Sequence, residues 1–398
     1  MGEHGYDVVI IGGGVAGLTA SIYLAGKGFR TALVSRGDPA CCLSTGCIDV
    51  LGAHEDPMKG IDRLPRNHPY RIAGRRTVID ALEAFLGLME ERGLPYRGSL
   101  GRNTGILTPI GTTKTTCLVP ITMEASSGFT TTHIHVVSFK GLRDFYPSYI
   151  TSRLANTSVS VFDAGTSSTL GLATKFDEPS FVDDFCAWLS GLELPPGKIA
   201  VPAVLGLKDP KAVLQRIRAS TGREIFEIPT LPPSVPGIRL FRALKDAFLA
   251  RGGHLYWGNA VASVETRSGQ VEAITMAGPC RPSRAHARAF ILATGSFVGG
   301  GLFAQRGSVR ETVFDLDVKV PGPRRDWFLN DFFSPGHPVE ASGIEVDSSF
   351  RPLGCGLKNL FACGSILAHG EIMRHRCGHG LAIATGSAAA RACERLLS

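Results

Sequence analysis

A strand, a glycine-rich turn and a helix near the amino end constrain the fold of this chain more than any other stretch. Tyr6 and Val8 to Ile11 form an apolar run that predicts a short buried parallel strand. The sequence GGGVAG from Gly12 to Gly17 follows and matches the pattern G-x-G-x-x-G. Residues 15–25 then predict a helix, and residues 31–34 predict a second strand. This order is typical of a βαβ unit that binds a nucleotide.

Each glycine of the turn has a separate physical role. Gly12 permits the tight turn, Gly14 lets a phosphate approach the backbone, and Gly17 lets the helix lie close to the strand. The helix, which opens with Val15 and Ala16, directs its first amides and its dipole towards the anion. The turn therefore predicts a bound dinucleotide or flavin.

The end of the second strand departs from the usual fingerprint. An acidic residue about 20 residues after the glycines normally holds the adenosine ribose. Here the sequence reads Val34-Ser35-Arg36-Gly37, and the first carboxylate is Asp38. Either Asp38 or a backbone group replaces that contact, or the cofactor is a flavin mononucleotide or carries a phosphate that Arg36 neutralises. We expect Ser35 and Arg36 to lie near the cofactor phosphate.

Composition narrows the class of protein. The 398 residues, 44% of them hydrophobic, are sufficient for two domains with real cores. The net charge of +7 comes without a long basic run, so nucleic-acid binding is not predicted. Because the sequence has neither an 18-residue apolar run nor a signal peptide, we expect a cytoplasmic protein, or one that is peripheral to a membrane through a partner.

A change in the residue pattern along the chain predicts the domain organisation. Residues 95–236 contain short β-branched runs broken by Gly and Pro, unlike the flanking segments. We therefore predict an α/β nucleotide-binding domain in two parts, residues 1–94 and 237–398, interrupted by an inserted α+β cap domain over residues 95–236. The Pro-rich run 228–236 is the candidate connection back to the first domain.

Periodicity predicts the other main elements. Helices are expected over residues 77–92, 181–189, 209–220, 238–251 and 378–395. Strands are expected over residues 134–139, 158–162, 254–257, 260–266, 271–276, 289–295 and 357–364. The strand over residues 271–276 and its two neighbours in sequence are predicted to form a β-meander, because turns at Ser268-Gly269 and Gly278-Pro279 separate them.

The order of these elements is similar to that of a known class. A Gly-rich start, a meander leading to Ala-Thr-Gly at residues 293–295, and a strand NLFACG before a Gly-rich helix resemble flavoproteins of the glutathione-reductase and fumarate-reductase type. More narrowly, TALVSRG with CCLSTGCIDVLG, and LKNLFACGSILAHG with GHGLAIATG, resemble the B subunit of anaerobic glycerol-3-phosphate dehydrogenase. The resemblance covers most of the chain apart from the insertion, and it implies a Rossmann-like FAD/NAD(P)-binding domain.

The resemblance also implies a function. In that family a catalytic A subunit, a flavin-binding B subunit and an iron–sulfur C subunit form a membrane-associated complex. The complex oxidises sn-glycerol 3-phosphate to dihydroxyacetone phosphate and passes the electrons towards quinone in anaerobic respiration. The flavin-binding chain is usually described with FMN, so FMN is favoured and FAD is the alternative. The expected location is the cytoplasmic face of the cell membrane, reached through the partners.

The flavoprotein class suggests further cofactor contacts. The loop after the second strand and the start of the last helix are expected to reach the flavin ring, and the helix amides would stabilise its anionic reduced form. These two segments are Ser44, Thr45, Gly46 and Cys47, and Gly378, His379, Gly380 and Leu381. The expected contacts at strand ends are Ala293, Thr294, Gly295, Gly364 and Ser365. Ser365 stands where the class commonly has Asp, which weakens FAD relative to FMN.

A basic loop before the last helix contains the candidate catalytic residues. They are His369, Arg374, His375 and Arg376. Arginine forks match phosphate oxygens and histidine titrates near neutrality, so the loop predicts a phosphate or carboxylate pocket with a proton donor or acceptor. The alternative is a solvated loop or a subunit contact, because the flavin-binding chain of such a complex need not bind substrate.

Other chemistry finds less support in the sequence. The ten cysteines form no C-x-x-C pair and no iron–sulfur or zinc spacing. His133 and His135 alternate on a predicted strand, but no third ligand is evident, so no metal site is expected. Motifs of hydrolases, zinc proteases and nucleoside triphosphatases do not occur.

Three rival functions stay open at the level of sequence. The first is a self-sufficient flavin enzyme of the fumarate-reductase type that acts on a small carboxylate or phosphate. The second is a mainly structural subunit that holds its partners together. The third is an NADP-binding protein that uses Arg36.

Overall fold

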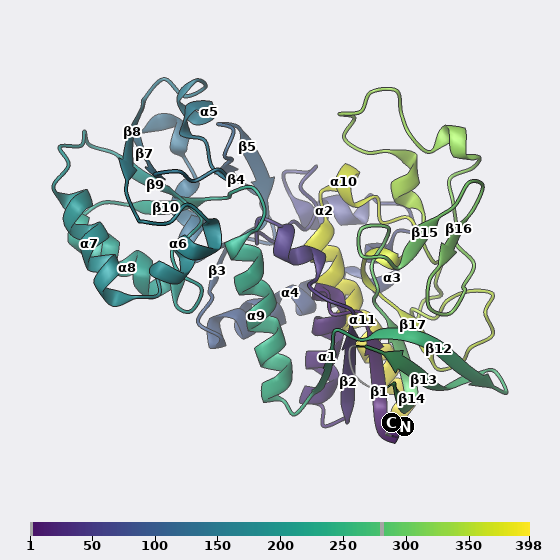
Figure 1. Cartoon of the computed structure of the whole chain (residues 1–398). Coiled ribbons are helices and arrows are strands. Elements are labelled where there is room, and N and C mark those ends of the chain that lie inside the picture. The colour runs from purple at the N-terminus through teal and green to yellow at the C-terminus, as the bar shows by residue number, and fades with distance from the viewer. Residues whose placement is uncertain (1–2, 279–281) are drawn as a thin grey trace. The chain divides into compact units, whose positions relative to one another are not determined.

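The chain divides into two compact units in a computed structural model that describes residues 3–278 and 282–398. The first unit consists of Met1–Ala40, Asp49–Phe85 and Leu244–Ser398. The second unit consists of Cys41–Ile48 and Leu86–Ala243. In Figure 1 the second unit is mainly blue and teal, and the first contains the purple, green and yellow elements.

A seven-stranded sheet forms the centre of the first unit. Its parallel strands are β1 (Glu3–Ile11), β2 (Thr31–Ser35), β11 (His254–Trp257), β14 (Ser283–Leu292) and β17 (Leu360–Ala362). β1 lies between β2 and β14, and its residues Val8, Val9, Ile10 and Ile11 are at most 4% exposed. The apolar run therefore forms the buried parallel strand that the sequence predicts.

β14 differs from its prediction in both bounds. The predicted strand covers residues 289–295, whereas the observed strand begins at Ser283 and ends at Leu292. Its first half pairs antiparallel with β13 (Gln270–Ala277), and its last three residues pair parallel with β17. β13 also pairs antiparallel with β12 (Ala260–Arg267), which confirms the predicted meander.

Helices α1 (Val15–Gly26) and α11 (Gly378–Leu397) pack against each other beside this sheet, as Figure 1 shows. A Cβ atom on Gly386 would overlap the carbonyl of Ala16, so the close approach depends on glycine. The Tyr23 hydroxyl donates a hydrogen bond of 2.6 Å to Glu394 near the other end of the pair. Small residues in α11 thus let the two helices share a narrow interface.

The remaining elements of the first unit are short. They are α2 (Pro57–Asp62), α3 (Pro69–Ala73), α10 (Ile372–His375), β15 (Leu302–Ala304) and β16 (Val309–Glu311). Two longer helices, α4 (Arg75–Glu91) and α9 (Val235–Ala250), contain the boundaries between the units. α9 begins at Val235 rather than at the predicted residue 238, because proline at position 236 suits the first turn of a helix.

The second unit contains a four-stranded parallel sheet in the order β10-β9-β7-β8. The strands are β7 (Ile134–Phe139), β8 (Thr157–Phe162), β9 (Lys198–Pro202) and β10 (Ile225–Ile228). The helices are α5 (Pro147–Thr151), α6 (Thr169–Lys175), α7 (Pro179–Ser190) and α8 (Pro210–Thr221), and Figure 1 shows α7 beside α8. Antiparallel pairs join β3 (Tyr96–Gly98) to β6 (Leu118–Pro120) and β4 (Thr104–Leu107) to β5 (Thr113–Thr116).

Two further features complete the fold. In the second unit, the rings of Phe139, Phe176 and Phe185 lie within 6.0 Å of one another in a core that also contains most of β7 and β9.

Across residues 3–278 and 282–398, we find no helix with both the length and the apolar character that crossing a bilayer requires.

A buried ion pair joins α9 to β10 within the second unit. Arg239 donates two hydrogen bonds, of 2.7 and 2.9 Å, to the carboxylate of Glu227, and both side chains are at most 2% exposed. Glu227 also accepts from the amide of Leu205 at 2.8 Å, and Arg239 donates to the carbonyl of Gly206 at 2.7 Å. The two charges are therefore compensated by each other and by the backbone.

Replacing Arg239 with Met should destabilise the second unit by about 3–5 kcal/mol, because the Glu227 carboxylate would stay buried without its partner. Urea unfolding followed by circular dichroism measures the change as a lower midpoint. Arg216→Met is the matched control: Arg216 pairs with Asp183 at the surface, so this change should cost less than about 1 kcal/mol. Equal midpoints for the two variants would contradict this interpretation of the buried pair.

Candidate functional site

The predicted cofactor residues of the first unit gather at one edge of its sheet. Because β1, β2, β14 and β17 run parallel, their carboxyl ends lie at the same edge. β2 and β14 lie on opposite sides of β1, and ligands of open α/β sheets bind at the carboxyl edge near such a reversal of strand order. The residues that end or follow these strands are Gly12, Gly14, Ser35, Arg36, Ala293, Thr294, Gly295, Gly364 and Ser365.

The three glycines of the turn differ in their surroundings. Gly12 has φ +121°, and a Cβ atom there would overlap the carbonyl of Ala293 at the end of β14. A Cβ atom on Gly17 would overlap the carbonyl of Gly12. At Gly14, in contrast, no described atom lies within 4 Å of the place that a Cβ atom would take. Backbone atoms therefore leave no room for a side chain at Gly12 and Gly17, so the turn is closed there. The space beside Gly14 is open.

The start of α1 lies directly behind this open position. Gly14 is the N-cap, with φ −75° and ψ 179°, and the helix opens with Val15, Ala16 and Gly17; the Leu18 amide then donates the first hydrogen bond within the helix, of 2.9 Å, to the Gly14 carbonyl. The first amides of a helix have no partner within the helix, and they carry the positive end of its dipole. With no side chain at Gly14 to cap them, these amides can bind a phosphate group.

Ser35 ends β2 and Arg36 follows it at the same edge, where the usual carboxylate is replaced. Ser35 is buried against Gly13, and its hydroxyl donates a hydrogen bond of 3.0 Å to the carbonyl of Gly37. Arg36 is exposed, and its guanidinium reaches Gly300, in the loop that follows β14. The side chain of Arg36 thus extends from the end of β2 to a segment on the other side of β1.

The ends of β14 and β17 meet close to the glycine turn. The Ser365 hydroxyl accepts a hydrogen bond of 3.2 Å from the amide of Ser296, and Gly364 (φ +81°) packs against Ala16 in the first turn of α1. The hydroxyl of Thr294 is buried, and it has no hydrogen-bond partner among the described residues. A buried polar atom of this kind at the edge is a candidate contact for a ligand.

The start of α11 provides fewer amides for a ligand than the sequence predicts. The Gly380 amide donates a hydrogen bond of 3.0 Å to the carbonyl of Asp49, and the Leu381 amide donates one of 2.8 Å to Cys377. Gly380 also lies against the Tyr70 hydroxyl, which is 2.6 Å from the place of a Cβ atom. Because these two amides bind within the protein, the amides of Gly380 and Leu381 are not available for the predicted contact with the flavin ring.

The loop between β17 and α11 is conformationally strained. Three of the six non-glycine residues with positive φ in the described chain lie there: His369 (63°), Glu371 (37°) and Arg376 (49°). Each such residue costs roughly 1–3 kcal/mol and persists only where the surroundings enforce it. Here the amide of His369 donates to Ala341 at 2.9 Å, and the carbonyl of Arg376 accepts from Gly52 at 3.0 Å. Because such strain clusters at functional sites, it supports a functional role for this loop.

A carboxylate orients His369. Its Nε2 atom lies 2.9 Å from an oxygen of Glu345, and a parallel bridge between Ile344 and Leu367 places the two residues side by side. A carboxylate in this position fixes the orientation of an imidazole ring. Sequence reasoning missed Glu345, because a long-range bridge brings it to the loop and no local motif marks it.

His375 packs against a second histidine that sequence reasoning also missed. Its ring meets the buried ring of His68 edge-on at 5.4 Å, and His68 stacks on Tyr70 at 5.5 Å. Burial, together with the nearby His375, lowers the pKa of His68 to about 3. Burial also lowers the pKa of His375, although Glu371 partly opposes this effect. Burial therefore favours the neutral form of both rings and makes His375 a weaker base than a free histidine.

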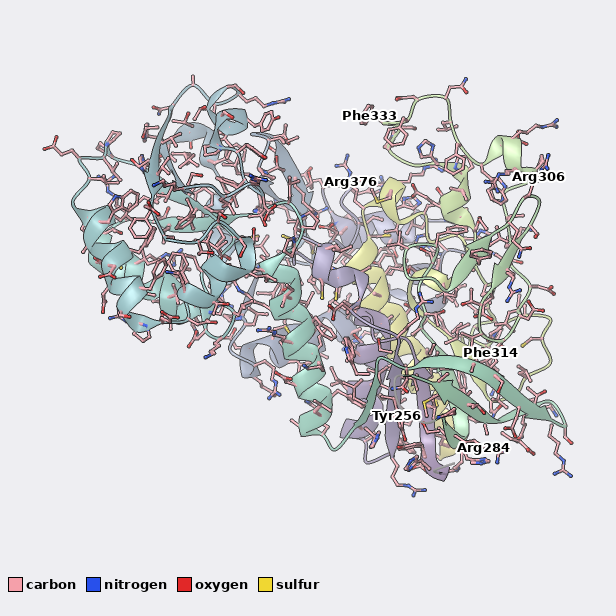
Figure 2. All side chains as sticks on the ribbon, in the orientation of Figure 1. Tyr256, Arg284, Arg306, Phe314, Phe333 and Arg376 are labelled. Carbon is pink, nitrogen blue, oxygen red and sulfur yellow. The ribbon has the colours of Figure 1, made fainter. Side chains whose placement is uncertain are left out.

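The two arginines of the loop differ in their partners. Arg374 donates to Glu371 at 2.7 Å, so its charge is already paired. Arg376 is exposed, and no carboxylate within the described residues forms an ion pair with its guanidinium. Figure 2 labels Arg376 in this loop of the first unit. Arg376 is thus the better placed of the two to bind an anion.

The predicted ring contacts at residues 44–47 belong to the second unit, where its own residues hold them. The Gly46 carbonyl accepts a hydrogen bond of 2.7 Å from the hydroxyl of Tyr96. Cys47 is buried, and its sulfur lies 3.9 Å from that of Met123 in a small apolar cluster. Ordered packing therefore fixes the conformation of this segment within its unit.

The cysteines and the histidine pair give little evidence for further chemistry. Cys280 lies outside the described residues, and no disulfide joins the nine cysteines within them. His133 and His135 each place a ring nitrogen near the Ser158 hydroxyl, at 2.9 and 2.8 Å. In the part of the chain that the structure describes, no group of three or more His, Cys, Asp or Glu side chains is arranged to hold a metal ion.

Comparison with known proteins identifies similar sequences over almost the whole chain. The family profile described as FAD binding domain matches residues 7–381. Three relatives are each named as the B subunit of anaerobic glycerol-3-phosphate dehydrogenase. The proteins of Vibrio vulnificus (strain YJ016) and Yersinia pseudotuberculosis are 31% and 30% identical, over 96% and 95% of this chain and 95% of each relative. That of Vibrio cholerae (strain ATCC 39315) is 28% identical over 99% of this chain and 97% of its own.

Replacing Gly14 with Val should remove bound flavin without unfolding the protein. The backbone angles of Gly14 suit valine and the position is open within the protein, so the cost to stability should be within about 0.5 kcal/mol. The added methyl groups would instead occupy the space that a phosphate needs. The measurement is the amount of flavin released by acid per chain, together with the unfolding midpoint.

Gly5→Val is the matched control for this change. Gly5 lies at the amino end of the same strand, β1, and no described atom lies within 4 Å of the place of its Cβ atom. This variant should keep its full flavin content. Undiminished flavin in Gly14→Val would contradict the placement of the phosphate.

Proposed function

We propose that this chain, which belongs to the family of B subunits of anaerobic glycerol-3-phosphate dehydrogenase, is the flavin-containing component of a complex that oxidises sn-glycerol 3-phosphate to dihydroxyacetone phosphate. The observation that carries the proposal is the glycine turn, which is closed at Gly12 and Gly17 and open at Gly14, at the start of a helix. Such a turn binds a phosphorylated cofactor through the backbone alone.

The residues at this edge fit a flavin, and they favour FMN over FAD within the proposal. The turn offers amides to a phosphate group, and the buried hydroxyl of Thr294 offers a polar contact that no described residue uses. No carboxylate occupies the place after β2 that normally holds an adenosine ribose, and Arg36 extends across this edge to Gly300. When bound, the flavin supplies the two-electron acceptor of the reaction.

The chain's own contribution to chemistry would come from the strained loop. Oxidation of the secondary alcohol removes a hydride from the carbon atom and a proton from the hydroxyl group. We assign the proton to His369, because Glu345 lies 2.9 Å from its Nε2 atom and orients the ring in the strained loop. We assign the phosphate group of the substrate to Arg376, which is exposed and strained, and whose guanidinium is free of carboxylate partners within the described residues.

The partners and the location are part of the same proposal. The relatives are named as one subunit of a dehydrogenase, which implies a complex of several chains. We propose that the others are a catalytic A subunit, which completes the substrate site together with this chain, and an iron–sulfur C subunit, that electrons leave through them towards quinone, and that they hold this chain at the cytoplasmic face of the membrane. The chain would then act as a dehydrogenase only within the assembled complex.

Replacing Arg376 with Gln should raise the KM for glycerol 3-phosphate by about 10- to 100-fold, because the change removes a charge-assisted hydrogen bond to the phosphate. The assay follows dye reduction by the assembled complex, after flavin content has been shown to be unchanged. Arg374→Gln is the control, since Glu371 already pairs that charge, and it should change the KM by less than about threefold.

Two outcomes would count against this assignment. Equal effects of the Arg376 and Arg374 variants would place substrate phosphate elsewhere. Turnover by the purified chain with no partner present would favour a self-sufficient enzyme over a component of a complex.

A further inference from the structure

A group of large apolar side chains lies exposed between β16 and α10 in the first unit. Phe328, Leu329, Phe332 and Phe333 are 58%, 48%, 80% and 88% exposed, and we refer to residues 327–333 as the aromatic loop. Figure 2 shows Phe333 on a loop that projects from the rest of the unit. The rings of Phe332 and Phe333 touch edge-on, 5.3 Å apart. Isolated apolar residues on a surface are ordinary, but four in one short loop are not.

The base of the aromatic loop is firmly attached to the unit. Trp327 is buried, and its indole nitrogen donates a hydrogen bond of 2.9 Å to the carbonyl of Gly322. The Arg324 guanidinium lies over the Trp327 ring, 5.3 Å from its centre, and donates to the carbonyl of Gln305 at 2.8 Å. The amide of Val339 donates to the carbonyl of Trp327 at 3.0 Å. The loop therefore begins from a fixed point.

The tip of the loop is also ordered by its own hydrogen bonds. The amide of Leu329 donates to Nδ1 of His337 at 3.1 Å, and the Phe328 ring lies 5.6 Å from the His337 ring. The amide of Phe333 donates to the side chain of Asp331 at 3.0 Å. Because the backbone is held in this way, the exposed rings form a preorganised surface, and a partner would bind it at a low entropic cost.

The charges around the loop distinguish a protein partner from a lipid surface. Arg324 and Arg325 are balanced by Asp326 and Asp331, all four of them exposed, so the loop has no net positive charge to attract anionic lipid. Phenylalanine and arginine are instead enriched at protein interfaces, where aromatic anchors are surrounded by a polar rim. The relatives are named as one subunit of a larger enzyme, which implies that other chains cover some surface of this protein.

We propose that the aromatic loop is the docking surface for the catalytic A subunit of the same complex, because Glu340 joins this part of the chain to the candidate catalytic loop. The partner surface would be an apolar groove that accepts Phe332 and Phe333, with charges of both signs at its rim to meet Arg325 and Asp331. This inference rests on the proposed function, because that function supplies the partner.

The aromatic loop is connected to the candidate catalytic loop. Glu340, a few residues after the aromatic loop, accepts hydrogen bonds from the amides of Met373 and Arg374, at 3.0 and 3.4 Å. Gly336 packs against Arg374, where a Cβ atom would lie 2.7 Å from the arginine Cβ. Docking at the aromatic loop therefore reaches the strained loop that contains His369, and it links assembly to activity.

The test uses the full chain carrying the double change Phe332→Asp and Phe333→Asp. Its binding to the purified A subunit should weaken at least about thirtyfold, because both anchors of the interface are lost. The rate of dye reduction at a fixed, low concentration of the A subunit should fall as binding weakens. A saturating concentration of the A subunit should restore this rate without a change in the KM for glycerol 3-phosphate. Flavin content and the unfolding midpoint should match those of the unchanged chain.

Val161→Asp is the control, since Val161 is 57% exposed on β8 of the second unit, and its effect on binding should stay within about threefold. Vesicles of phosphatidylcholine and phosphatidylglycerol, and sedimentation of the chain alone, test the other occupants. The proposal is overturned if the double change abolishes vesicle binding or self-association and leaves binding to the catalytic partner intact, or if it alters none of them.

These outcomes separate this proposal from the proposed function. A complex that assembles through the aromatic loop but does not oxidise glycerol 3-phosphate would disprove the function and support the docking surface. A complex that oxidises this substrate and assembles equally well with the double change would support the function and disprove the docking surface.

Discussion

The rest of the first unit depends on one constraint: β1, α1 and β14 meet through direct contacts between backbone atoms. Gly12 touches the carbonyl that ends β14, and Gly17 touches the carbonyl of Gly12, so any side chain at either place would separate the elements. The same closeness recurs where Gly364 and Gly386 approach Ala16. Four glycines thus bring the ends of three strands, β1, β14 and β17, together with two helices, α1 and α11, at one edge of the sheet.

This closeness also creates the chemistry of the edge. Helix amides and strand-end carbonyls become the lining, and the open position at Gly14 lies where the dipole of α1 favours an anion. The strained loop leads into α11, which packs on α1. Within the proposed function, its His369, held by Glu345, and its exposed Arg376 supply the proton acceptor and the positive charge that backbone groups cannot provide. Within the proposed function, cofactor binding is therefore a property of backbone geometry, and substrate chemistry is a property of side chains.

Local patterns in the sequence are sufficient for much of the fold, and contacts between distant segments explain what they miss. The strand at Ile134–Phe139 matches its prediction to the residue, because a β-branched apolar run specifies a buried strand by itself. β17 is shorter than predicted, since it pairs only with the last three residues of β14 and Gly364 then adopts a positive φ. The partner of His369 could not be predicted, because the bridge between Ile344 and Leu367 that brings Glu345 to it has no sequence signal.

The identity of the chromophore tests the central claim most directly: the flavin phosphate rests on the open glycine turn, and Arg36 lies where an adenosine would otherwise extend. Acid release from the purified full chain, followed by mass spectrometry and quantification per chain, gives the answer. The expected result is one FMN per chain. Release of FAD would contradict the role given to Arg36, and a colourless chain that is fully folded would contradict the phosphate site itself.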